Sequence, residues 1–76
     1  RAEPLTATEY KILRLLMINA RRIVPKVQIL QEVWSRRSGG SLNNVEIYIS
    51  YLRKKIDHGR APMIHTVRGC GYLLKP

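Results

Sequence analysis

The sequence has little of three things: cysteine, acidic side chains and long apolar runs. A single cysteine, Cys70, cannot form an internal disulfide, so a secreted scaffold held together by disulfides is excluded. Arg14 interrupts the apolar stretch that begins at Tyr10, and no segment is long and apolar enough to span a membrane. Because no signal peptide is recognisable either, we expect a cytoplasmic location and no membrane partner.

The scarcity of acidic residues leaves a large positive charge. There are 5 Asp and Glu against 14 Lys and Arg, which gives a formal net charge of +9 on 76 residues. Such an excess repels itself, so a polyanionic partner is favoured, with nucleic acid as the first candidate. An anionic membrane surface is the second candidate, and a basic surface that serves only solubility is the alternative. The length predicts one small domain, which buries only about 60% of its unfolded surface.

The sequence offers too few converging groups for a catalytic or metal site. Cys70 and His65 could meet across a hairpin, but two ligands do not make a structural zinc site. No nucleophile and base are evidently oriented by a third group. Arg68 close to Cys70 would favour a reactive thiolate, although the simpler interpretation is a small apolar residue at a turn. We therefore expect no enzyme activity, no metal and no cofactor.

Two helices are predicted in the first half of the chain. Thr6 and Glu9 have the spacing of a capping box, and the helical apolar period behind them predicts a helix over about 6–19. The β-branched residues before Pro25 predict a short extended segment. Pro25 then suits the first position of a second helix over about 25–34, and the Ser-Gly-rich segment 35–42 is predicted to be a loop.

A third helix over about 43–57 has two contrasting faces. Its apolar residues recur at helical spacing and predict a core stripe of Val45, Ile49, Leu52 and Ile56. The opposite face carries Asn43, Ile47, Ser50 and Lys54, flanked by Asn44 and Tyr51. Amides suit adenine edges, an aliphatic group suits a thymine methyl, and cations suit phosphates, so this face fits DNA. The alternative is an ordinary basic surface helix.

Two strand-like runs joined by Arg-Gly-Cys-Gly predict a hairpin over 63–75. Three helices followed by a hairpin indicate a winged helix-turn-helix fold, mainly α with a small β component. Arg68 lies at the expected hairpin tip, where a basic side chain suits the narrow and negative minor groove. The loop before the third helix is longer than the compact turn of a plain helix-turn-helix.

Four blocks carry a family resemblance: L-T-x-x-E-Y-x-I-L, V-P-x-x-x-I-L-x-x-V-W, N-V-E-x-Y-I-S-Y-L-R-K-K-I and I-H-T-V-R-G-x-G-Y-L-L. Together they resemble the C-terminal effector domain of OmpR/PhoB-type bacterial response regulators, over residues 5–74. The resemblance implies sequence-specific binding of double-stranded promoter DNA within a two-component system. It also implies two copies arranged head-to-tail on a direct repeat, an N-terminal receiver domain in the full-length protein, and contact with RNA polymerase.

The resemblance assigns roles residue by residue. The helix over 43–57 would lie in the major groove, and the wing would reach the minor groove. Base contacts fall to Asn43, Asn44, Glu46, Ile47, Tyr51 and Arg68. Backbone contacts fall to Tyr48, Ser50, Arg53, Lys54, Thr66 and Tyr72. The loop that could touch RNA polymerase comprises Ser35, Arg36, Arg37, Ser38, Gly39, Gly40, Ser41 and Leu42.

Three departures from the family pattern stand out. Only a tail of residues 1–4 precedes the domain, where relatives carry a small N-terminal sheet. The hydroxyl that usually caps the second helix is replaced by Val24 and Pro25, which weakens that cap. Ser50 and Tyr51 stand where many relatives carry arginine, so the DNA target does not carry over. The exposed Ile47 and Tyr51 also leave open a module that docks on a protein or membrane without reading DNA.

Overall fold

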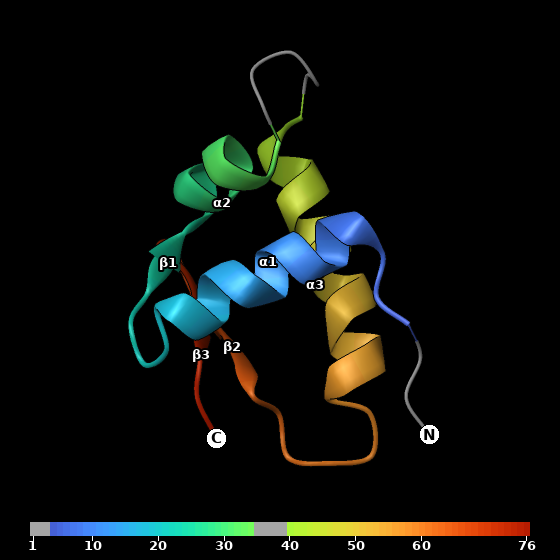
Figure 1. The fold of residues 1–76 in the computed structure, drawn as a ribbon. Helices are drawn as coiled ribbons and strands as arrows, with labels where there is room; N and C mark the ends of the chain where they lie inside the picture. Colours follow the sequence, from blue (N-terminus) through green and yellow to red (C-terminus); the bar gives the residue numbers. More distant parts are fainter. Residues whose placement is uncertain (1–3, 35–39) are drawn as a thin grey trace.

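The computed structural model describes residues 4–34 and 40–76 and shows a winged helix (Figure 1). The chain forms three helices and a small antiparallel sheet, as the sequence predicted for the fold class. In chain order the elements are α1 (Ala7–Ile18), β1 (Val24–Pro25), α2 (Lys26–Val33), α3 (Leu42–Ile56), β2 (Ile64–Val67) and β3 (Gly71–Leu74).

The first helix begins at the predicted capping box. The Thr6 hydroxyl accepts a hydrogen bond from the Glu9 amide at 3.1 Å, and the Glu9 carboxylate accepts one from the Thr6 amide at 2.9 Å. Two amides that have no partner inside the helix are thereby satisfied, which fixes where α1 starts. The helix ends at Ile18, with Asn19 as its C-cap.

The prediction that Pro25 is the first residue of the second helix was wrong. Pro25 has an extended backbone (φ −62°, ψ 147°) and belongs to β1, so α2 begins at Lys26. The cause is sheet pairing, because Val24 lies opposite Tyr72 and Pro25 lies opposite Gly71. As expected from the missing hydroxyl, no side chain caps α2. The third helix is displaced by one residue from the prediction and includes Leu42, which had been assigned to the loop.

The sheet joins a distant segment to the predicted hairpin. Its strand order is β1-β3-β2, so β3 lies in the middle and both of its neighbours are antiparallel to it. Gly71 is required by the close approach of β1, since a Cβ there would lie 2.1 Å from the Val24 carbonyl oxygen. Gly69 has a different role, because its φ of +77° forms the turn between β2 and β3.

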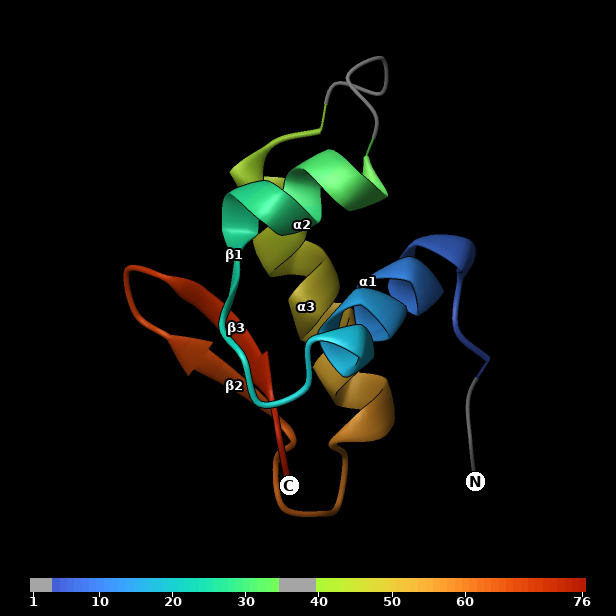
Figure 2. The same ribbon diagram turned by 60° about the vertical axis from the view of Figure 1, so that its left-hand side comes forward.

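The core lies where the helices meet the sheet. α1 crosses α3 in both views (Figures 1 and 2), and Figure 2 shows the tip of the β2–β3 hairpin extending away from α1. The predicted stripe of α3 is buried at Val45, Ile49 and Leu52 and partly buried at Ile56. The other buried apolar side chains are Ile12, Leu15, Leu16, Val24, Ile29, Ile64, Tyr72 and Leu74. Among the described residues, the helices are too short or too polar to cross a membrane.

Candidate nucleic-acid interface

The outward face of α3 is open to solvent, as its pattern predicted. Asn43, Ser50 and Lys54 are exposed, and the larger Ile47 and Tyr51 keep 39% and 46% of their surface accessible. The stripe on the other side of the same helix is buried in the core, so the helix is held rigidly while this face stays available. Glu46 is the only acidic residue of α3.

Three aromatic rings support the middle of this face. Tyr48 is half-buried and contacts Trp34 and Tyr51 edge-on, with ring centroids 5.5 Å and 5.4 Å apart. Edge-to-face pairs of this kind restrict the rings that form them. Trp34 follows α2, so the cluster also ties that helix to α3. Apart from the presence of three aromatic residues, no local sequence pattern indicates these contacts.

Glu46 is already engaged by a lysine from the neighbouring helix. The Nζ atom of Lys26, the first residue of α2, lies 2.7 Å from Glu46 Oε2. The hydrogen bond to Glu46 raises the pKa of Lys26, so the lysine remains charged. Both side chains are partly accessible, so Lys26 lies beside Glu46 at the edge of the candidate interface. An ion pair between residues 20 positions apart has no local sequence signature.

Asn44 lies at the beginning of α3 and is partly buried. The hydroxyl of Ser41, the residue that precedes the helix, donates to Asn44 Oδ1 at 3.3 Å. The backbone amide of Asn44 also donates to the Ser41 carbonyl at 2.9 Å. The predicted base contact is therefore positioned by the segment that leads into the helix.

The predicted wing is a hairpin with an exposed arginine at its turn. Arg68 is accessible, and the turn is closed by a hydrogen bond from the Cys70 amide to the Val67 carbonyl at 2.9 Å. Cys70 is exposed and carries a free thiol. The Nε2 atom of His65 lies 3.2 Å from the Lys75 carbonyl oxygen. Within residues 4–34 and 40–76, no three His, Cys, Asp or Glu side chains gather as metal ligands would.

Two of the predicted backbone contacts are placed differently from the rest. Tyr72 is only 4% exposed and belongs to the core, so its ring offers almost no surface to a ligand. Arg53 is partly buried and donates to the Ile64 carbonyl and the Thr66 hydroxyl in β2. Both residues therefore connect the helices to the wing, because Lys26 and Arg53 lie over the Tyr72 ring at 5.9 Å and 5.7 Å from its centroid.

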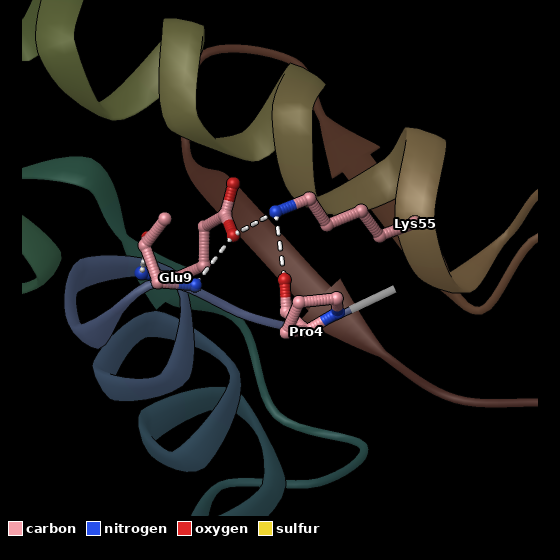
Figure 3. A network of polar contacts seen from close by, with 4 residues as sticks. Pro4, Glu9 and Lys55 are labelled. Carbon is pink, nitrogen blue, oxygen red and sulfur yellow. Dashed lines mark hydrogen bonds and ion pairs between the residues drawn. The ribbon is translucent and has the colours of Figure 1, made fainter. Parts of the chain in front are cut away.

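A polar network anchors the other end of α3 to α1 (Figure 3). Lys55 donates to Glu9 Oε1 at 2.6 Å and to the Pro4 carbonyl at 3.0 Å. Burial raises the pKa of the Glu9 carboxyl, but the hydrogen bonds from Lys55 and Thr6 and the Lys55 charge outweigh it and lower the pKa below 4.5. The Glu9 carboxylate is thus a buried anion with two hydrogen-bond donors, the Thr6 amide and Lys55 Nζ, and it ties the end of α3 to the start of α1.

The loop predicted to touch RNA polymerase is only partly visible. Ser35, Arg36, Arg37, Ser38 and Gly39 lie outside the described residues. Gly40 packs so closely against Trp34 and Leu30 that a Cβ would lie 2.9 Å from the Trp34 ring. Ser41 precedes α3 and Leu42 is its first residue, so the end of this segment belongs to the helix.

Comparison with known proteins identifies the family. Residues 1–74 match the family described as "Transcriptional regulatory protein, C terminal". The chain is 62% identical over 72 residues to the probable transcriptional regulatory protein TcrX of Mycobacterium tuberculosis, covering 95% of this chain and 31% of TcrX. It therefore spans about a third of the length of that relative.

Solved structures agree with this assignment. The DNA-binding domain of response regulator AdeR, in complex with an intercistronic region, superimposes with a TM-score of 0.84 at 30% identity, over 96% of this chain and 74% of that one. The Klebsiella pneumoniae RstA DNA-binding domain, in complex with the RstA box, gives a TM-score of 0.81 at 29% identity with the same coverage of 96% and 74%. The chain belongs to the OmpR/PhoB-type DNA-binding domains of response regulators, a family of transcription regulators and not of enzymes.

Proposed function

We propose that this chain binds double-stranded DNA sequence-specifically, as the effector domain of a two-component transcription regulator. The observation that carries the proposal is the outward face of α3, which presents amide, hydroxyl, aliphatic and cationic groups from a helix anchored in the core. An α-helix fits the major groove, where each base pair has its own pattern of donors and acceptors. The two related domains crystallised with DNA support the same use of this fold.

Base reading is assigned to side chains in the first three turns of α3, of which Asn44 is partly buried and the others are exposed. The amides of Asn43 and Asn44 can bond the N6 and N7 positions of adenine, and Ile47 and Tyr51 offer apolar contact to a thymine methyl. Glu46 can accept from a cytosine amino group while Lys26 limits its repulsion of the phosphates. Arg68 is assigned to the adjacent minor groove.

Backbone contacts position the domain on the duplex without reading sequence. Ser50 and Lys54 are exposed on α3, Thr66 is exposed on β2, and Tyr48 supports the same face. Tyr72 is assigned a supporting role in place of a direct contact, because its ring is buried.

The larger assembly is part of the proposal. TcrX is about three times as long as the matched segment, which leaves room for a receiver domain in a full-length protein of that kind. Binding of two copies head-to-tail on a direct repeat would double the number of phosphates contacted. The segment 35–42, with Arg36 and Arg37, is proposed to face RNA polymerase.

The test begins with selection of bound duplexes from a random pool, followed by titration of the enriched and scrambled sequences at several salt concentrations. We expect a steep salt dependence, about 0.9 log unit of affinity per log unit of salt for each phosphate neutralised. Asn43→Ala should reduce the preference for the enriched duplex by roughly 1–3 kcal/mol and leave scrambled DNA nearly unaffected. If no sequence is enriched from the pool, or if the affinity does not depend on salt concentration, the proposal of sequence-specific DNA binding is contradicted.

The same samples test the alternative of a docking module that does not read DNA. Ile47 and Tyr51 are the observation in its favour, since both are exposed and apolar in part. Capture on anionic vesicles that persists in excess enriched duplex would support the alternative. Displacement from the vesicles by the enriched duplex, and not by scrambled DNA, would support the proposed function.

A further inference from the structure

Arg53 lies where α3 meets the wing, and its guanidinium is bound to the wing. Nε and Nη2 donate to the same carbonyl oxygen of Ile64 at 3.3 Å and 3.0 Å, and Nη2 also donates to the Thr66 hydroxyl at 2.6 Å. The guanidinium carbon lies 5.7 Å from the centroid of the Tyr72 ring. The side chain therefore contacts β2 by hydrogen bonds and lies over the Tyr72 ring of β3 at cation–π distance.

These contacts restrain the hairpin in several directions. The planar guanidinium of Arg53 restrains movement of β2 along its own direction, because two of its donors bind the same carbonyl oxygen. The Tyr72 ring restrains β3, and Thr66 lies opposite Tyr72 in the register of the two strands. Arg68 follows Thr66 by two positions, so the orientation of the wing arginine depends on the pair that Arg53 binds.

We propose that Arg53 is a positioning residue that fixes the wing against α3, so that the two DNA-contacting elements act as one rigid unit. This inference rests on the proposed DNA binding and refines it. Arg53 acts through the position of Arg68 and is not itself a phosphate contact. The family resemblance had predicted a direct backbone contact, whereas the structure commits the donors of Nε and Nη2 to the protein.

The first test is a double-mutant cycle on the enriched duplex, followed by fluorescence anisotropy. Arg53→Ala and Arg68→Ala should each weaken binding on the order of tenfold, as expected for the loss of hydrogen bonds to a charged group. The affinity of the double variant should lie within about twofold of the affinity of the weaker-binding single variant, because Arg53 has no wing arginine left to position once Arg68 is removed. Additive losses would overturn the proposal.

Lys54→Ala is the matched control, because Lys54 is the exposed neighbour of Arg53 on α3. A direct phosphate contact by Lys54 should weaken binding by the same factor whether or not Arg68 is present. In the Arg68→Ala background, Arg53→Ala should leave the salt dependence unchanged, whereas loss of a phosphate contact would reduce the slope by about 0.9. A reduced slope would assign Arg53 to the DNA backbone and reject the positioning role.

Arg53→Lys distinguishes the effect of the charge from the effect of the hydrogen-bond geometry. It also replaces Arg53→Ala in these tests if Arg53→Ala folds poorly. An ammonium keeps the charge but cannot form the planar fork, so Arg53→Lys should lose about as much affinity as Arg53→Ala. Full affinity in Arg53→Lys would show that charge alone matters and would contradict the inference.

Amide hydrogen exchange in the free chain provides a measurement that does not involve DNA. Arg53→Lys should speed exchange at the Cys70 amide, which closes the hairpin turn, and leave the α1 amides unchanged. Unaltered exchange in the hairpin would overturn the positioning role. If the native chain enriches no duplex at all, the proposed function fails, and this measurement still decides whether Arg53 holds the wing.

Discussion

Glu9 and Lys55 form an ion pair across 46 positions of sequence, with 2.6 Å between Glu9 Oε1 and Lys55 Nζ. It connects the first turn of α1 to the last turn of α3 (Figure 3). The side chain of Glu9 is 3% exposed and that of Lys55 is 19% exposed, so solvent screens the pair only weakly. Since α3 carries the candidate reading face, this pair also fixes where that face points.

Glu9→Gln should destabilise the chain at neutral pH and flatten the acid limb of its stability profile. The pKa of Glu9 is lower in the folded chain than its ordinary value of 4.5, so its stabilisation is complete above that value and is lost as pH falls below it. The loss should be about 1–3 kcal/mol at pH 7, because Lys55 keeps a buried donor without its anion. Urea denaturation between pH 3 and 7 measures both effects. An unchanged pH profile in Glu9→Gln would show that the pair contributes nothing.

The two wing glycines should respond differently to the same substitution. Gly71→Asn should destabilise by at least about 2 kcal/mol, since a Cβ would lie 2.1 Å from the Val24 carbonyl and force β1 away. Gly69→Asn should cost less than about 1 kcal/mol, because asparagine tolerates the positive φ and a Cβ there meets open space. Thermal unfolding of the two variants makes the comparison, and equal losses would contradict the close-approach explanation.

Two isoleucines on opposite faces of α3 form a matched pair. Ile49 is 1% exposed and Ile47 is 39% exposed. Ile49→Ala should lower the free energy of unfolding by roughly 2–5 kcal/mol through the cavity it leaves. Ile47→Ala should change stability by about 0.5 kcal/mol or less and yet reduce discrimination between duplexes. Both variants are measured by denaturation and by duplex titration. If Ile47→Ala lost stability and Ile49→Ala lost only discrimination, the assignment of the two residues to the outward and buried faces would be wrong.

The Lys26–Glu46 pair predicts a coupling in DNA binding. Lys26→Met leaves the Glu46 carboxylate uncompensated near the phosphates, so affinity for duplex DNA should fall several-fold. Adding Glu46→Gln should recover part of that loss, because it removes the repelling charge. The four affinities form a double-mutant cycle, and purely additive effects would show that Lys26 contacts DNA independently of Glu46.

Much of the fold could be predicted because its signals are local. The capping box of Thr6 and Glu9, the stripe from Val45 to Ile56 and the Gly69 turn each depend on residues only a few positions apart. The exposed face of α3 followed from the same helical period. The contact roles assigned to that face remain predictions.

The misplaced beginning of α2 shows where local rules stop. Proline favours the first turn of a helix, and its preceding residue favours an extended backbone, so both states were compatible with Val24 and Pro25. Pairing with Tyr72 and Gly71 decided in favour of the strand. Those partners lie almost at the other end of the chain, which no local pattern reports.

The sequence by itself determined the class of the domain, its positive charge and the helix face that is turned outward, because charge and helical period are properties of composition and neighbours. Only the tertiary structure decided which of these side chains already bond within the protein or are buried in it. Arg53 is bound to the wing, Glu46 to Lys26, and Tyr72 is enclosed in the core. Contacts of this kind depend on distances between separate elements, and packing fixes those distances.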